Sequence, residues 1–163
     1  MLTGSEPVSA ANLKAALGAG KDNGGTFVSS GSSGSGGFNK FEKSTIAGGF
    51  MLAGDGFSVV CDASGFYRLT GEWTVKLIHS GDYACSCYMD AKIIAGDSTS
   101  TVVDNAYLAA SRNEETSKTA AIDAVFYIKK GQAVKMEYIV RDKSSGGYIR
   151  SNANLTIQTN RSK

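Results

Sequence analysis

The chain has little material for several kinds of chemistry. Its 163 residues include one histidine, one proline and three cysteines. A metal site or a histidine-based proton relay would have to be built from very few side chains. No recognisable motif sets a nucleophile beside His79, so this residue does not indicate catalysis. We therefore expect a protein that is not an enzyme and that has no catalytic residues, no cofactor and no metal ion.

The charges are nearly balanced, and long apolar runs are missing. Seventeen basic and fifteen acidic side chains give a net charge of +2. This is too little positive charge for a surface that follows a nucleic-acid backbone. No apolar run approaches the roughly 18 residues that cross a bilayer, and no secretory signal is visible. We expect neither nucleic-acid binding nor membrane insertion.

The cysteines resemble half of a metal site but are better explained as core residues. Cys85 and Cys87 point the same way in a strand, with Cα atoms roughly 6.5–7 Å apart, at the limit of what a disulfide spans. Zinc would need two further ligands. Unpaired cysteines are among the most buried residue types, so we expect core thiols. An odd number of cysteines also fits assembly in a reducing compartment.

Residues 1–17 are predicted to form a short helix. Ser9 is a good N-cap, and apolar side chains follow it at helical spacing. Isolated helices this short are marginal in water. Docking on a partner, or on copies of itself, is favoured over packing on its own domain. The residues expected to anchor the chain are Val8, Ala10, Leu13 and Leu17.

Residues 18–45 are predicted to be a linker. Thirteen of the twenty residues from Gly18 to Gly37 are Gly or Ser, and only Phe27 and Val28 among them could bury much surface. Such a segment does not recover its ordering entropy and behaves as a flexible spacer. A phosphate-binding loop is excluded because no GxxxxGK[ST] pattern occurs.

Residues 46–163 are predicted to form an all-β domain. Short runs rich in Val, Ile, Tyr, Phe and Thr are separated by Gly, Asp, Asn and Ser every 8–14 residues. This spacing indicates an antiparallel sandwich or barrel of eight to ten strands. The expected strands are Phe57–Cys61, Phe66–Thr70, Glu72–His79, Tyr83–Met89, Ala91–Ala95, Thr99–Val103, Ala106–Ser111, Ala120–Ile128, Ala133–Val140 and Tyr148–Thr159.

Two hairpins are predicted from alternating apolar residues. In the first, a three-residue loop at 80–82 would bring apolar side chains into cross-strand pairs, because a one-residue slip would turn them outward. Its buried face is expected to be Trp73, Val75, Leu77, Cys85, Cys87 and Met89. The second hairpin joins its strands through residues 129–132. Its buried face is expected to be Ile122, Ala124, Phe126, Ile128, Val134, Met136, Tyr138 and Val140.

The opposite face of the second predicted hairpin is more apolar than a solvent-facing surface needs. It contains Val125, Tyr127 and Ile139. A subunit contact or a second covering layer of the same chain would explain it. Tyrosines are a further set of candidates for ligand binding, because their rings can stack on sugars, although none forms a cluster in the sequence. The residues considered for ligand binding are Tyr107 and Tyr148.

The order of these parts resembles the head-fibre, decoration and tail-fibre proteins of tailed bacteriophages. The stretch PVSAANLKAAL is similar to their N-terminal segments, which attach to a capsid or tail protein. The domain at 46–163 resembles the jelly roll of complement-type and tumour-necrosis-factor-like proteins. The matching stretches are SGFYRL at 64–69, like "G-x-Y-x-F", and IKKGQAV at 128–134, like "L-x-x-G-D-x-V".

This resemblance implies a homotrimeric, non-enzymatic virion protein. It would be assembled in the host cytoplasm and attached through its N-terminus, and its distal domain would be a jelly roll. The trimer would bury Val125, Tyr127 and Ile139 around a three-fold axis. The alternative function is a receptor- or carbohydrate-binding module at a fibre tip, which recognises a host surface glycan.

Overall fold

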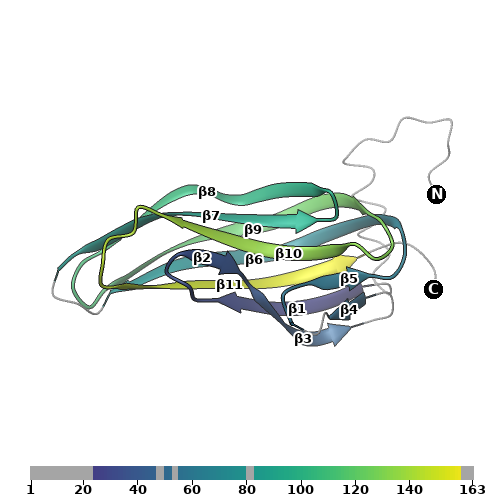
Figure 1. Cartoon of the computed structure of the whole chain (residues 1–163), viewed down its shortest axis with the longest axis horizontal. Coiled ribbons are helices and arrows are strands. Elements are labelled where there is room, and N and C mark those ends of the chain that lie inside the picture. The colour runs from purple at the N-terminus through teal and green to yellow at the C-terminus, as the bar shows by residue number, and fades with distance from the viewer. Residues whose placement is uncertain (1–23, 47–49, 53–54, 80–82, 159–163) are drawn as a thin grey trace.

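The computed structural model describes residues 24–46, 50–52, 55–79 and 83–158, and their regular elements are all β-strands (Figure 1). They contain no helix that could cross a membrane. The helix predicted within 1–17 lies outside the described residues. The strands are β1 (Gly24–Gly31), β2 (Gly36–Phe38), β3 (Lys40–Ile46), β4 (Phe50–Leu52), β5 (Val59–Cys61), β6 (Gly65–His79), β7 (Cys85–Ala95), β8 (Ser98–Ala110), β9 (Glu115–Ile128), β10 (Ala133–Arg141) and β11 (Gly147–Gln158).

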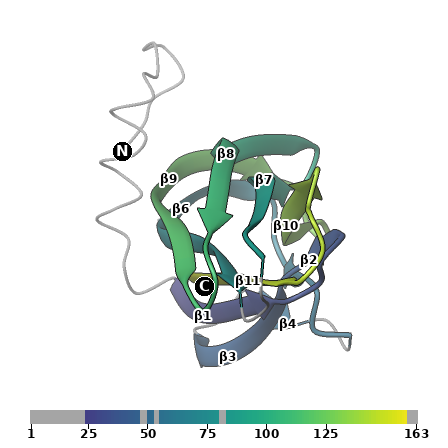
Figure 2. The ribbon, with the colours of Figure 1, turned by 90° about the vertical axis from the view of Figure 1, so that its left-hand side faces the viewer.

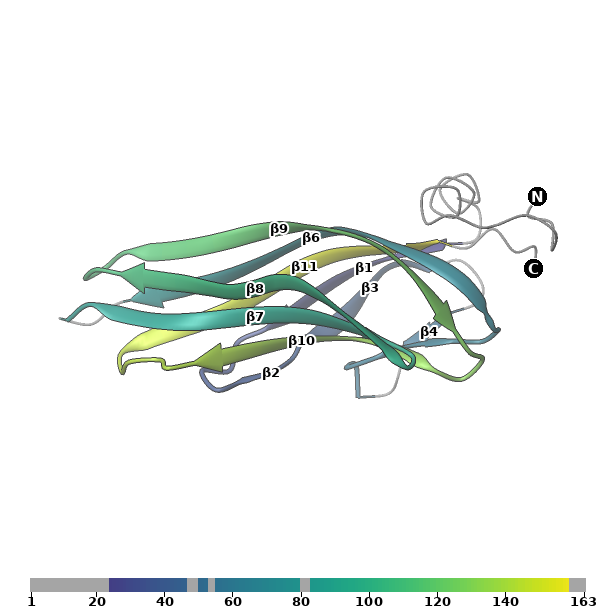
Figure 3. The ribbon, with the colours of Figure 1, turned by 90° about the horizontal axis from the view of Figure 1, so that it is seen from above.

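The strands form two antiparallel sheets that pack as two layers (Figures 2 and 3). The five-stranded sheet has the order β3-β1-β11-β6-β9. The six-stranded sheet has the order β4-β5-β10-β7-β8, and β2 also pairs with β10. From β5 to β11 the chain changes sheet at every connection except β7–β8. This is the topology of a jelly roll, so the predicted all-β antiparallel jelly-roll sandwich is confirmed. Eight of the strands, β4 to β11, lie in 46–163.

The core lies between the sheets and is built from alternate residues of each strand. On β6 the side chains of Trp73, Val75 and Leu77 are fully buried. The Trp73 indole N–H donates a 2.7 Å hydrogen bond to the hydroxyl of Ser151 on β11. A buried indole needs such an acceptor, so this bond links β6 to β11 without leaving an unpaired donor.

Both predicted hairpins are wrong, although their buried faces are nearly right. Strand β6 pairs with β9 and β11, whereas β7 pairs with β8 and β10. Strands β9 and β10 also belong to different sheets. The two strands of each predicted hairpin therefore belong to opposite sheets. The predicted inward residues are buried except for Ala124 and Val140, which are partly buried. Alternation determines which side of a strand is buried, but two facing sheets satisfy it as well as one hairpin does.

The predicted linker is also wrong from residue 24 onward. Strands β1, β2 and β3 fall within or end just past 18–45, and β1 pairs with β11 on one side and β3 on the other. Phe27 and Phe41 are buried, with ring centroids 6.0 Å apart and nearly perpendicular planes. The Gly/Ser-rich segment is ordered because its backbone hydrogen-bonds to β11 and its few large side chains enter the core.

Strand β6 runs unbroken through Gly71, where a break between two strands was predicted. The φ angle of Gly71 is 146°, in a region that residues with a side chain rarely adopt. A Cβ atom at this position would collide with the backbone carbonyl oxygen of Asn154 on β11. Glycine therefore allows β6 and β11 to pair continuously from Arg68 to His79.

Candidate functional site

The outer face of the five-stranded sheet carries several large apolar side chains that are exposed. Phe66 and Tyr127 are cross-strand partners at one end, with ring centroids 5.2 Å apart in an edge-to-face arrangement. Tyr148 lies opposite Ile78 near the other end. The large apolar side chains left exposed on this face are Val28, Phe66, Tyr127 and Tyr148, with exposed fractions of 45–58%.

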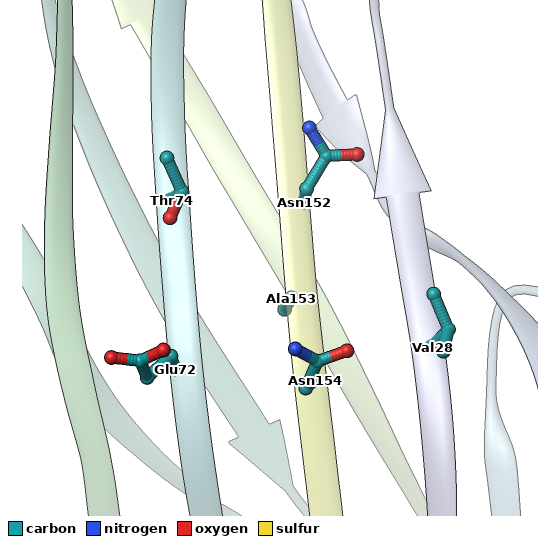
Figure 4. A pocket seen from close by; sticks show the side chains of 6 residues that line it. All are labelled: Val28, Glu72, Thr74, Asn152, Ala153 and Asn154. Carbon is teal, nitrogen blue, oxygen red and sulfur yellow. The ribbon is translucent and has the colours of Figure 1, made fainter.

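The middle of this face is a polar depression (Figure 4). Thr74 on β6 lies opposite Asn152 on β11, and Glu72 lies opposite Asn154. Val28 on β1 lines the opposite side of the depression. Amides, hydroxyls and one carboxylate can exchange hydrogen bonds with a partner, but they do not form a nucleophile and its base. The depression is therefore suited to recognition.

Charges of opposite sign occupy neighbouring parts of this face. The acidic row consists of Glu42, Val28, Asn154 and Glu72, which are successive cross-strand partners. Basic side chains lie one and two rows away: Lys40, Lys76 and Arg150. Lys76 contacts Glu115 at 3.4 Å, whereas Arg150, directly opposite Lys76, has no carboxylate partner among the described residues. Like charges in direct opposition destabilise a sheet, so a carboxylate from outside the chain would stabilise Arg150.

The residues predicted for a subunit interface do not share a surface. Val125 and Tyr127 lie on β9 in the five-stranded sheet, with Tyr127 exposed and Val125 partly buried. Ile139 lies on β10 in the six-stranded sheet, opposite Asp90. Val28 and Phe66 were not predicted from the sequence as interface residues. The alternation of side chains could have identified both, because each points to the side of its strand opposite the buried residues.

The two tyrosines considered for ligand binding are also apart. Tyr107 lies on β8 of the six-stranded sheet and Tyr148 on β11 of the five-stranded sheet, and each is 58% exposed. They cannot line one site. The predicted anchoring residues Val8, Ala10, Leu13 and Leu17 lie outside the described residues.

The cysteines and the histidine are core residues. Cys61, Cys85 and Cys87 are buried. The pKa of Cys87 is raised to about 11, mainly because the thiol is buried and secondly because Cys85 lies nearby. Lys143 has the opposite effect and lowers this pKa. The Cys87 thiol is therefore protonated and unreactive near neutral pH. His79 is 3% exposed and its Nδ1 lies 2.9 Å from the carbonyl oxygen of Gly146. Among the described residues, no group of three or more His, Cys, Asp or Glu side chains could hold a metal ion.

Comparison with known proteins gives similarity in fold alone. No family model matches the chain, and no curated protein matches its sequence. The Eiger TNF of S. frugiperda is 11% identical with a TM-score of 0.47, over 86% of this chain and 95% of that one. The globular domain of zebrafish complement 1qA is 12% identical with a TM-score of 0.44, over 85% and 98%. Murine APRIL is 11% identical with a TM-score of 0.40, over 79% and 98%. The assignment to the jelly rolls stands on the strand order of this chain itself.

Proposed function

We propose that the chain is a non-enzymatic assembly protein that forms a homotrimer through the outer face of the five-stranded sheet. In this proposal it is a fibre or decoration subunit of a tailed bacteriophage, attached through residues 1–17 to a capsid or tail protein. It is assembled in the host cytoplasm and functions in the virion. The observation that supports it is the combination of exposed aromatic residues and opposite charges on one sheet face.

The apolar side chains of this face favour association. Tyr148 is 58% exposed and Tyr127 is 48% exposed, although both sit on regular strands. Rigid tyrosines with an exposed ring and a polar tip are enriched in interfaces because they bury much area at little entropic cost. The interface includes Val125 and Tyr127, as the sequence predicted, together with Val28, Phe66 and Tyr148, but not Ile139.

The charges of the same face favour identical partners in a rotational arrangement. In a ring of three, each subunit presents one part of the face to the next subunit and another part to the previous one. The acidic row of one copy can then meet the basic side chains of its neighbour, which supplies the carboxylate that Arg150 lacks within the described residues. Complementary charges also select the register and orientation of the copies.

The mass of the full chain in solution tests this assembly. We expect light scattering and analytical ultracentrifugation at micromolar concentration to give three times the 17.0 kDa chain mass. The trimer should weaken at high salt because part of its interface is ionic. A chain that stays at 17.0 kDa would overturn the proposed function.

Attachment through residues 1–17 is supported by the resemblance of PVSAANLKAAL to the N-terminal segments of phage fibres. Three such segments on one trimer raise the effective concentration at the particle, so weak contacts by Val8, Ala10, Leu13 and Leu17 suffice together. Because β1 begins at Gly24, only residues 18–23 separate the anchor from the first strand.

Deleting residues 1–17 should abolish attachment without changing assembly. We expect the shortened chain to keep the mass of a trimer and to be absent from virus particles made in cells that express it. The measurement is immunoblotting of purified particles, with the Leu13→Asp/Leu17→Asp full chain as a second variant that should also be absent. Shortened chains that still co-purify with particles would assign the attachment to another part of the protein.

A further inference from the structure

A cluster of aromatic and polar side chains lies on the outer face of the six-stranded sheet, which the proposed trimer does not use. Arg141 on β10 is the cross-strand partner of Tyr88 on β7, and Tyr88 is the partner of Tyr107 on β8. The three side chains thus form one row across three neighbouring strands. We name this row, together with Asp90 and Asn105, the tyrosine platform.

The aromatic rings of the platform lie against one another. The ring centroids of Tyr88 and Tyr107 are 5.0 Å apart, with a tilt of 50°. The Arg141 guanidinium carbon is 5.9 Å from the Tyr88 centroid, within the range of a cation–π contact. Tyr88 is covered from two sides, whereas Tyr107 remains 58% exposed. Tyr107 is therefore the ring that a ligand can reach.

A β-bulge holds the polar groups beside these rings. The pairing of β7 with β8 shifts register next to Met89, and Asn105 in the bulge has a φ angle of 51°. Its backbone N–H donates to Asp90 Oδ1 at 2.6 Å. Arg141 Nη2 donates to both oxygens of Asp90, at 3.1 and 3.2 Å, and to Asn105 Oδ1 at 2.7 Å. These bonds fix the side chains before any ligand arrives, which lowers the cost of binding.

Several donors of the platform remain available. Asn105 Nδ2 and the Nε and Nη1 atoms of Arg141 make no hydrogen bond within the described residues, and Arg141 is exposed. The Arg141 and Asp90 charges compensate each other, so an anion gains little here. An exposed ring beside oriented N–H donors instead suits a ligand with one C–H face and a rim of hydroxyl groups.

We propose that the tyrosine platform binds a neutral pyranose unit of a glycan. The partially positive C–H face of the sugar stacks on the negative face of the Tyr107 ring. Its hydroxyl oxygens accept hydrogen bonds from Asn105 Nδ2 and from the outer nitrogens of Arg141. Binding at one platform does not depend on trimerisation. In a trimer, three platforms would act together on a repeating glycan.

An array of neutral hexose and N-acetylhexosamine oligosaccharides, probed with the full-length chain, tests this proposal. We expect saturable binding to at least one oligosaccharide, which is then titrated by calorimetry against each variant. Tyr107→Ala should weaken binding about tenfold or more, because the stacking surface is lost. Tyr107→Phe keeps the ring and should stay within about threefold of the wild type.

Tyr83→Ala is the matched control, because Tyr83 is 85% exposed but lies before β7 and outside the platform. It should bind as the wild type does. A wild-type chain that binds no oligosaccharide on the array would overturn the proposal, and so would a Tyr107→Ala variant with unchanged affinity or an equal loss in Tyr83→Ala. The mass of each variant shows whether it is still a trimer, so a loss of glycan binding can be told apart from a loss of assembly. A monomeric chain that binds would support the platform and overturn the proposed assembly.

Discussion

The Tyr148→Glu chain is expected to sediment as a 17.0 kDa monomer under conditions in which the wild-type chain forms a trimer. Tyr148 is exposed near one end of the five-stranded sheet, opposite Ile78. Removing its ring deletes apolar contact, and a glutamate in its place would have to be buried at the interface. An interface aromatic of this kind carries about 2 kcal/mol or more, and desolvating a carboxylate in its place costs further free energy. Sedimentation velocity across a concentration series measures the change.

Tyr107→Glu is the control for this variant. Tyr107 has the same exposed fraction, 58%, but lies on the six-stranded sheet. It should leave the mass of the trimer unchanged. If both variants stay trimeric, Tyr148 does not belong to the interface. If Tyr107→Glu alone dissociates, the interface is on the opposite sheet and the proposed surface is wrong.

Gly71→Ala should lower the free energy of unfolding by about 2–4 kcal/mol, since it combines a disfavoured backbone conformation with a steric collision. The φ angle of 146° disfavours any residue with a Cβ atom, and the added methyl would meet the carbonyl oxygen of Asn154. Strands β6 and β11 must separate locally to relieve this collision. Both strands supply core residues and the outer face, so the loss reaches the proposed interface as well. Urea unfolding followed by Trp73 fluorescence measures the effect.

Gly131→Ala separates the two causes. Gly131 also has a positive φ angle, 88°, but apart from its own atoms and its two chain neighbours nothing lies within 4 Å of where its Cβ would be. Gly131→Ala should lower the free energy of unfolding by the backbone strain alone, about 1–2 kcal/mol. Equal losses in the two variants would mean that the contact with Asn154 relaxes freely and that Gly71 is needed for its φ angle alone.

The candidate surfaces were only partly predictable from the sequence. Alternation placed Val125 and Tyr127 on the outward side of β9, whereas Tyr107 and Tyr148 were considered only because aromatic rings can stack on sugars. It could not determine which outward residues become neighbours. The tyrosine platform depends on β10, β7 and β8 lying side by side and on the bulge at Asn105, and neither follows from the spacing of residues along the chain.

The β-rich composition and period-two alternation determined by themselves that this chain forms an antiparallel sandwich, and they determined which side of most strands faces the core. Those properties are local, because successive side chains of a strand point to opposite faces whatever the strand pairs with. Only the tertiary structure decided that the predicted hairpins are crossings between sheets, and that the Gly/Ser-rich residues from Gly24 onward are strands. Pairing is a contact between distant segments, and the backbone groups that order β1 belong to β11, more than a hundred residues away.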